Sequence, residues 1–223
     1  MLQARELAGL DGVRAYGVAG SPGFIALIAS RGAFGPAPTL VLSGINRGAN
    51  AGHAILHSGT VGAALTAAAS GARAMAVSLD VLTAAVASAG SGGAAIAEVD
   101  LVDDESRHWD TAGQFAAALM PALESAPPGT VFNLNVPDSP RAEVRGLCRA
   151  GMARFGQVQI AIAEVGRGFV RTALEEHAGR LEEGTDLALL ADGYAAVTAL
   201  RGICESPDRS LLRDLPQAPP RPH

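Results

Sequence analysis

The stretch from Leu40 to Leu79 decides the fold of this chain: LVLSGINRGANAGHAILHSGTVGAALTAAASGARAMAVSL. A short apolar run is followed by a glycine-rich segment over 43–52, an alanine-rich stretch and a second apolar run over 74–79. This order predicts a strand, a loop, a helix and a strand. Such a unit presents backbone N–H groups and a helix N-terminus to an anionic ligand. Because the loop also carries Asn, Ser and Thr, it suits a phosphate or a hard metal ion better than an apolar ligand.

Three familiar motifs are excluded by the spacing in this loop. Its glycines at 44, 48 and 52 recur every fourth residue, so the G-x-G-x-x-G of dinucleotide-binding folds is absent. No Gly-Lys-Ser/Thr follows, which excludes a Walker A loop. The nucleophile elbow of a serine hydrolase would need glycine where Leu56 stands. The residues alone leave one alternative open, a glycine-rich turn that only lets strand and helix pack closely.

Short motifs recur in a fixed order from about residue 20 to residue 200. They are Ser43-Gly44-Ile45-Asn46-x-Gly48-x-Asn50, Ser58-Gly59-Thr60-Val61, Ala76-Val77-Ser78-Leu79, Gly20-Ser21-Pro22, His108-Trp109-Asp110-Thr111-Ala112, Asn133-Leu134-Asn135-Val136-Pro137 and Gly184-Thr185-Asp186 with Gly193-Tyr194. In this order they resemble the SurE (survival protein E) family of metal-dependent 5'/3'-nucleotidases.

The resemblance implies a fold and a domain organisation. The expected fold class is α/β, a Rossmann-like, doubly wound and mostly parallel sheet with a smaller β-rich C-terminal extension that relatives use to build dimers. We expect one SurE-like domain over 1–205, N-terminally incomplete relative to the family. An Ala/Gly/Ser-rich insertion at about 81–106 interrupts it, and a disordered tail over 206–223 follows.

The resemblance also implies a metal site, of which one residue can be carried over. Family members open with Asn-Asp-Asp-Gly, whose aspartates hold the metal together with a serine and the asparagine of Ser-Gly-Ile-Asn. No Asn-Asp-Asp-Gly occurs in this sequence, so Asn46 is the predicted metal ligand and the catalytic residues are unknown. The alternative for Asn46 is a loop asparagine bonded to its own backbone. We interpret the pair Asp103-Asp104 as an exposed acidic turn.

Four residues are predicted to bind the substrate phosphate: Asn50, Ser58, Gly59 and Thr60. The last three stand at the expected start of a helix, where N–H groups and hydroxyls can meet an anion. For Ser58 and Thr60, N-capping of the helix uses the same atoms and remains an equal alternative.

Three other groups of residues are predicted to be structural. His53 and His57 have the i, i+4 spacing of a metal pair, but we interpret them as facing solvent. His108 and Trp109 frame the start of a helix that Asp110 is expected to cap. Arg149, Arg154 and Phe155 could rim a pocket or belong to a solvated edge strand.

Local patterns outside the central stretch predict further elements. Residues 12–18 alternate as in a strand, and Ser21-Pro22 starts a helix, so two consecutive βα units favour a parallel sheet. A helix is expected over 109–123 and strands over 131–136 and 158–162. The runs 187–190 and 194–200 are predicted to be a late pair of strands.

Composition agrees with one domain in a reducing compartment. The 223 residues are 48% hydrophobic, which suffices for a sizeable core, and the net charge of -5 argues against a nucleic-acid duplex as partner. The two cysteines form no disulfide framework or metal spacing, no apolar run approaches the roughly 20 residues of a membrane span, and no signal peptide is evident, so we expect a cytoplasmic protein.

The sequence-based hypothesis is therefore a metal-dependent phosphomonoester hydrolase that acts on nucleoside 5'- or 3'-monophosphates. The resemblance implies one divalent metal ion (Mg, Mn or Ca, not distinguished) and a homodimer or tetramer. The alternative is a truncated, non-catalytic nucleotide-binding or dimerisation remnant of the same fold. An NAD-type oxidoreductase is disfavoured because its glycine motif is missing.

Overall fold

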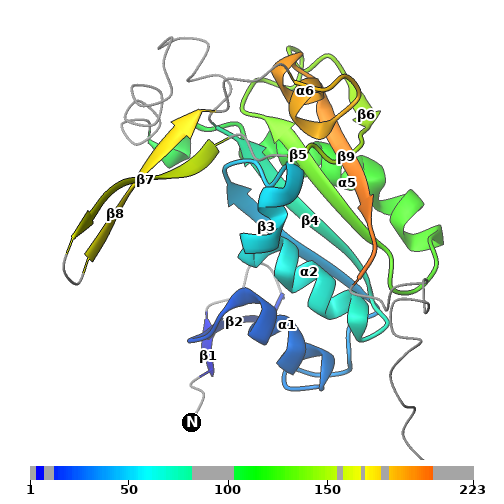
Figure 1. Cartoon of the computed structure of the whole chain (residues 1–223). Helices are drawn as coiled ribbons and strands as arrows, with labels where there is room; N and C mark the ends of the chain where they lie inside the picture. The colour runs from blue at the N-terminus through cyan, green and yellow to red at the C-terminus, as the bar shows by residue number, and fades with distance from the viewer. Residues whose placement is uncertain are drawn as a thin grey trace, which may run out of the picture.

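A five-stranded sheet forms the centre of the molecule (Figure 1). The computed structural model describes residues 4–7, 13–81, 103–154, 158–166, 169–176 and 181–202. The strand order is β3 (Leu40–Arg47), β4 (Arg73–Asp80), β5 (Val131–Pro137), β9 (Ala195–Leu200) and β6 (Leu147–Arg149). β9 runs antiparallel to β5, and the other neighbouring pairs are parallel. The expectation of a mostly parallel α/β sheet is confirmed.

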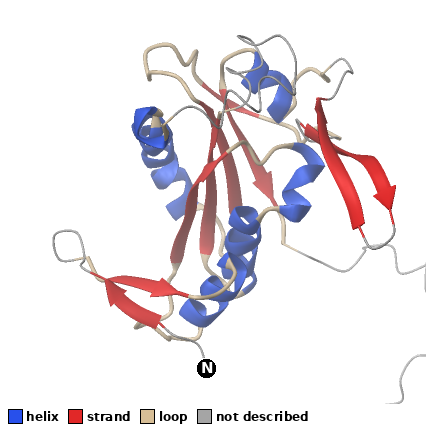
Figure 2. Cartoon of the chain, turned by 90° about the vertical axis from the view of Figure 1, so that its left-hand side faces the viewer, coloured by secondary structure: helices blue, strands red, loops and turns tan. Residues whose placement is uncertain are grey.

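Helices cover both faces of this sheet (Figure 2). The period of two along β4 sends Ala74 and Ala76 toward α2 (Gly59–Ala69), while Met75 and Leu79 face α5 (Trp109–Ser125). The small side chains on the first face let α2 approach the sheet closely. The larger ones on the second face form the main apolar core with α5.

The N-terminal elements lie outside the central sheet. β1 (Ala4–Leu7) and β2 (Ala15–Val18) pair with each other in a separate antiparallel sheet, so the prediction that this βα unit extends the parallel sheet is wrong. Tyr16 of β2 stacks on Phe34, at 4.9 Å between ring centroids, so β2 packs against the segment that follows α1. α1 (Pro22–Ser30) packs on α2, and the predicted N-cap is confirmed, since Ser21 Oγ accepts from the Phe24 N–H.

The C-terminal half supplies a hairpin and a short helix. β7 (Val158–Gly166) and β8 (Phe169–Glu176) form an antiparallel pair that projects from the sheet (Figure 1), in the place of the predicted β-rich extension. Residues 187–190 were predicted as a strand but lie in α6 (Asp186–Ala191). The helix is stabilised at its start because Thr185 Oγ1 caps it and accepts from the Ala188 N–H. Just beyond its end, Gly193 turns the chain with φ 79°.

Two short 3₁₀ segments complete the described structure: η1 (Gly52–His57) and η2 (Asp104–Ser106). Most of the predicted insertion, 82–102, and the predicted tail, 206–223, lie outside the described residues, so the domain boundaries stay a prediction. Across the described ranges, no helix combines the length and the apolar character needed to cross a membrane.

Candidate functional site

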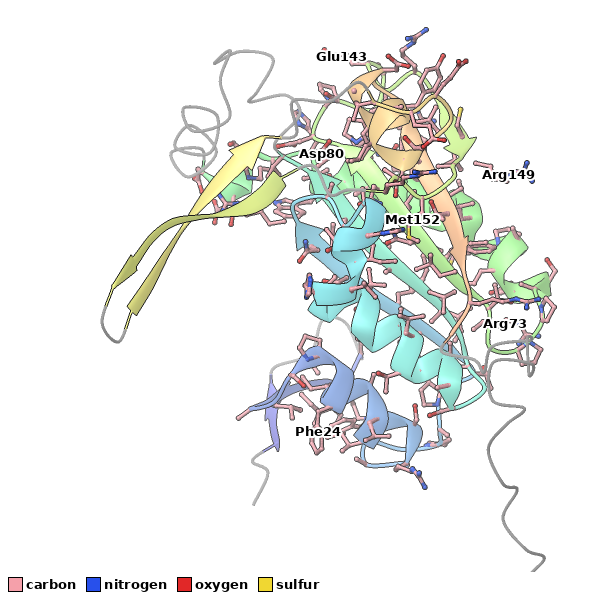
Figure 3. The ribbon with its side chains drawn as sticks, viewed as in Figure 1. Phe24, Arg73, Asp80, Glu143, Arg149 and Met152 are labelled. Atoms are coloured by element: carbon pink, nitrogen blue, oxygen red, sulfur yellow. The ribbon has the colours of Figure 1, made fainter. Side chains whose placement is uncertain are left out.

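The glycine-rich loop leaves β3 at the edge where the parallel strands end. Asn46 of β3 lies opposite Ser78 of β4, which lies opposite Asn135 of β5. Ligands of open α/β sheets bind beyond this carboxyl edge. Asp80, labelled in Figure 3, marks the same edge at the end of β4. Gly44 is required because a Cβ there would collide with the Val77 carbonyl oxygen. The row of polar residues therefore lies where the fold class places its ligands.

Asn46 joins the loop to the start of α2. Its Nδ2 donates to the carbonyl oxygens of Arg47 at 3.2 Å and Gly48 at 2.8 Å, and its Oδ1 accepts from Thr60 Oγ1 at 3.2 Å. The amide therefore makes the backbone contacts of a loop asparagine, while its carbonyl oxygen faces the helix start. Asn46, the predicted metal ligand, and Thr60, a predicted phosphate-binding residue, are therefore in direct contact.

Ser58 and Thr60 have different roles at the start of α2. Ser58 is the N-cap, and its Oγ accepts from the Val61 N–H at 3.1 Å. Thr60 does not cap the helix, because its hydroxyl is directed to Asn46. Gly59 is exposed, and a Cβ there would lie 3.2 Å from Pro22 Cγ of α1. We call Asn46, Ser58, Gly59 and Thr60 the phosphate loop, after the ligand predicted for the last three, which lie where the first-turn N–H groups of α2 have no intrahelical acceptors.

Asn50 belongs to a buried network instead. Its N–H donates to Asn135 Oδ1 at 2.7 Å, and its carbonyl oxygen accepts from Asn133 Nδ2 at 2.7 Å and Asn135 Nδ2 at 3.0 Å. Its own Nδ2 donates to Ser78 Oγ at 2.8 Å. We call Asn50, Ser78, Asn133 and Asn135 the asparagine brace. Sequence reasoning did not assign the last three, although polar residues inside apolar strands were a visible signal.

Asp186 extends this support to the next turn of the loop. Its carboxylate accepts from the N–H groups of Gly52 at 2.8 Å, Ala153 at 3.0 Å and Leu187 at 2.9 Å. The side chain is 1% exposed, so these donors replace water entirely. The late Gly-Thr-Asp motif is thus a structural anchor for the segment around residue 52.

Charged residues form a continuous chain beside the phosphate loop. Asp104 Oδ1 lies 3.1 Å from Arg47 Nε and 3.0 Å from Arg107 Nε, and Arg107 Nη1 lies 3.0 Å from Asp138 Oδ2. Asp104 remains 60% exposed, which agrees with the predicted acidic turn, here neutralised by arginine. Asp138 also contacts His108 Nδ1 at 3.0 Å.

Three smaller predictions can be compared with the structure. His53 and His57 lie in η1 and are both exposed, as expected. His108 and Trp109 frame the start of α5, but the predicted cap is wrong, because His108 holds the N-cap position and Asp110 lies inside the first turn. Arg149 at the end of β6 is exposed and lines one pocket together with Ser58 and Met152, whereas Arg154 is exposed and Phe155 lies outside the described residues.

The described residues do not form a complete binding site for a metal ion. Within those ranges, no three His, Cys, Asp or Glu side chains come together as a possible metal centre. Asn46 Oδ1 is half-buried and already accepts from Thr60. One hard oxygen does not make a divalent-cation site. The described residues thus offer one candidate metal ligand, Asn46 Oδ1.

The fold and the site define the class of protein: a doubly wound α/β protein with a polar loop and a helix N-terminus at the carboxyl edge of its sheet. A family model for survival protein SurE matches residues 1–159. The 5'-nucleotidase SurE of Erythrobacter litoralis is 32% identical over 200 residues, which cover 85% of this chain and 71% of the relative. The chain therefore belongs to the SurE family.

Two further comparisons agree. The 5'/3'-nucleotidase SurE of Escherichia coli O127:H6 is 32% identical over 171 residues, which cover 74% of this chain and 58% of that protein, so the chain spans little more than half of this relative's length. The crystal structure of the SurE protein from Aquifex aeolicus matches with a TM-score of 0.66 at 23% identity, over 96% of this chain and 78% of that one. The structural match supports the fold, and the named relatives support a nucleotidase function.

Proposed function

We propose that this chain is a phosphomonoesterase that hydrolyses nucleoside 5'- or 3'-monophosphates with the help of one divalent metal ion. The observation that carries the proposal is the 3.2 Å contact between Thr60 Oγ1 and Asn46 Oδ1, made where β3 ends and α2 begins. At this point a helix N-terminus offers N–H groups to an anion, and a hydroxyl can turn from its asparagine partner toward a phosphoryl oxygen.

The phosphate loop supplies electrostatic stabilisation in this proposal. In the transition state of phosphoryl transfer the charge is spread over the three equatorial oxygens, and donors fixed in advance stabilise it. Gly59 lets the phosphate approach the backbone closely, while the asparagine brace and Asp186 hold the loop in place. A bound divalent ion would add Lewis-acid stabilisation of the phosphoryl group, and Asn46 Oδ1 is the oxygen that the loop offers to it.

One alternative keeps the binding chemistry and omits the reaction. The missing acidic cluster among the described residues favours a chain that binds a nucleotide without hydrolysing it, or that serves in a dimer. The family resemblance implies a homodimer or tetramer, so we include self-association in the proposal. Sedimentation velocity on the purified chain tests that part separately.

Phosphate release tests the proposed activity. The full chain is incubated with 5'-AMP or 3'-AMP in the presence of Mg²⁺, Mn²⁺, Ca²⁺ or EDTA. We expect release that requires a divalent ion and falls by about 10-fold or more in Asn46→Ala, the loss typical of a weakened metal site. His53→Ala, an exposed change in the same loop, is the matched control and should retain full activity.

Two outcomes would contradict parts of this assignment. Binding of 5'-AMP in equilibrium dialysis without any phosphate release would support the non-catalytic alternative. Release that survives both EDTA and Asn46→Ala would remove the metal ion and Asn46 from the mechanism.

A further inference from the structure

A cavity of about 840 Å³ lies between α2 and the strands β9 and β6. One wall is a single face of α2, on which Ser58, Gly62 and Leu65 follow one another at helical spacing. The opposite wall includes Thr198 and Leu200 of β9. A volume of this size is typical of a site for a small organic molecule and exceeds what a phosphate group alone fills.

The cavity is lined largely by apolar side chains, and two of them are open to solvent. Leu56 of η1 is 80% exposed, and Met152, labelled in Figure 3, is 39% exposed. Ile55 and Leu65 line the same cavity. Apolar side chains around a concave site favour a ligand with a flat or aliphatic body, because binding removes apolar surface from water.

One hydroxyl group in the cavity wall has no partner. Thr198 is 7% exposed, and its Oγ1 forms no hydrogen bond among the described residues. Alternate residues of a strand share a face, so Thr198 is on the same face of β9 as Leu200, which packs toward α2. Buried hydroxyls are normally hydrogen-bonded. A ligand hydroxyl that enters the cavity would supply the missing partner.

The cavity adjoins the phosphate loop on the side opposite to Asn46. Ser58 belongs both to the loop and to the cavity wall. Thr60 is two residues further along, about 200° around a helix of 3.6 residues per turn, and its hydroxyl contacts Asn46. A phosphate at the start of α2 therefore has Asn46 on one side and the cavity on the other. Since attacking and leaving oxygens lie roughly in line in phosphoryl transfer, attack from the Asn46 side directs the leaving group toward the cavity.

We infer that this cavity holds the nucleoside of the substrate and makes the chain selective for nucleotides over small phosphate esters. The inference rests on the function proposed above. In this arrangement the base packs between the apolar side chains of η1, α2 and Met152, and a ribose hydroxyl pairs with Thr198 Oγ1. The phosphate stays at the loop, at the first turn of α2.

Filling the cavity tests this role. A Cβ on Gly62 would meet no atom within 4 Å, so Gly62→Leu adds a side chain at the cavity wall without a clash, and leucine favours the helix. We expect the ratio of kcat/KM for 5'-AMP to kcat/KM for glycerol 3-phosphate to fall by about 10-fold or more. Both esters release a primary alcohol, so the ratio isolates the contribution of the nucleoside.

A matched control and a second variant keep structural effects apart. Gly113→Leu on α5, at the other face of the sheet, also meets no atom within 4 Å and should keep the wild-type ratio. Thr198→Val keeps the shape of the side chain and removes the unpaired hydroxyl, so its melting temperature should not fall. In isothermal titration calorimetry it should bind adenosine about 3- to 10-fold more weakly, which corresponds to the loss of one neutral hydrogen bond.

Adenosine, which lacks the phosphate, separates this inference from the proposed function. In ¹H–¹⁵N spectra of the wild-type chain it should shift the amides of Gly62, Leu65 and Met152, and Gly62→Leu should abolish these shifts. If the wild-type chain releases no phosphate from either ester but the shifts remain, the proposed function fails and the nucleoside site stands. Unmoved amides, or an unchanged ratio in Gly62→Leu, would overturn the nucleoside site and leave the nucleotidase proposal in place.

Discussion

The asparagine brace and the phosphate loop use the same residue types in opposite ways. In the brace, Asn133 and Asn135 are buried, and their amide groups are hydrogen-bonded to the backbone of Asn50. In the loop, Asn46 and Thr60 are half-exposed and bond to each other across a helix N-terminus. The brace therefore holds the backbone, and the loop keeps donors and an acceptor within reach of a ligand.

This difference shows that a recognisable motif does not by itself distinguish a scaffold from a binding site. Asn50 lies only four residues from Asn46, and its backbone N–H and carbonyl oxygen are both taken by the brace. Burial and hydrogen bonds to the backbone point to support, whereas exposure and an exchangeable contact point to chemistry. Asn50 as a substrate-binding residue stays a prediction.

Removing Asp186 should give the largest effect. Asp186→Ala leaves three buried N–H donors without their acceptor, and each such group costs about 1–3 kcal/mol. We expect the free energy of unfolding to fall by about 4 kcal/mol in urea denaturation. Asp192→Ala, at the exposed end of the same helix, should change it by no more than about 0.5 kcal/mol. A loss below about 1 kcal/mol for Asp186→Ala would show that the anchor is dispensable.

Thr60→Val should separate the loop from the scaffold. The change keeps the shape and removes the hydroxyl that we propose turns from Asn46 to the phosphoryl group, which should lower kcat/KM for 5'-AMP by about 100-fold, or about 2.7 kcal/mol. Thr66→Val is the matched control on α2, where the hydroxyl only bonds to the Gly62 carbonyl oxygen. Wild-type kcat/KM per folded Thr60→Val molecule, with a lowered melting temperature, would make Thr60 a structural residue.

In contrast to Thr60→Val, Asn135→Ala should lower stability and leave turnover nearly unchanged. It removes the acceptor of the Asn50 N–H and a donor to the Asn50 carbonyl oxygen inside the core, so we expect about 2 kcal/mol of lost stability. Turnover of 5'-AMP per folded molecule should stay close to wild type. If turnover falls as far as in Thr60→Val while stability holds, the brace takes part in the chemistry and the division into two regions is wrong.

Ser58→Ala should have the smallest effect. Loss of the N-cap bond to Val61 costs about 1 kcal/mol, which differential scanning calorimetry can detect. Ser70→Ala, at the exposed C-cap of the same helix, is the control and should stay within about 0.5 kcal/mol. An additional 10-fold loss of kcat/KM per folded molecule would show that Ser58 also contacts the substrate.

Sequence reasoning succeeded where the determining signals are local. The β3–loop–α2–β4 unit and the cap at Ser21 depend on neighbouring residues and form as predicted. The cap at Ser58 is one of the two roles that the sequence left open for this residue. Membership of the SurE family was also visible, because its motifs occur in order along the chain.

Long-range contacts explain what the sequence did not reveal. The brace joins Asn50 to Asn133 and Asn135, which are 83 and 85 positions further along the chain, and no local pattern specifies such partners. Residues 187–190 form an apolar run too short to distinguish strand from helix by periodicity. The sequence also did not reveal the contact between Asn46 and Thr60, because the two residues are 14 positions apart and meet only when the loop between β3 and α2 is folded.

A ¹H–¹⁵N titration of the full chain with 5'-AMP tests most directly whether the phosphate loop is the ligand site and the asparagine brace its support. The account predicts that the backbone amides of Gly59 and Thr60 shift as 5'-AMP binds, while those of Asn133 and Asn135 stay in place. Shifts concentrated in the brace, with the amides of Gly59 and Thr60 unmoved, would contradict it.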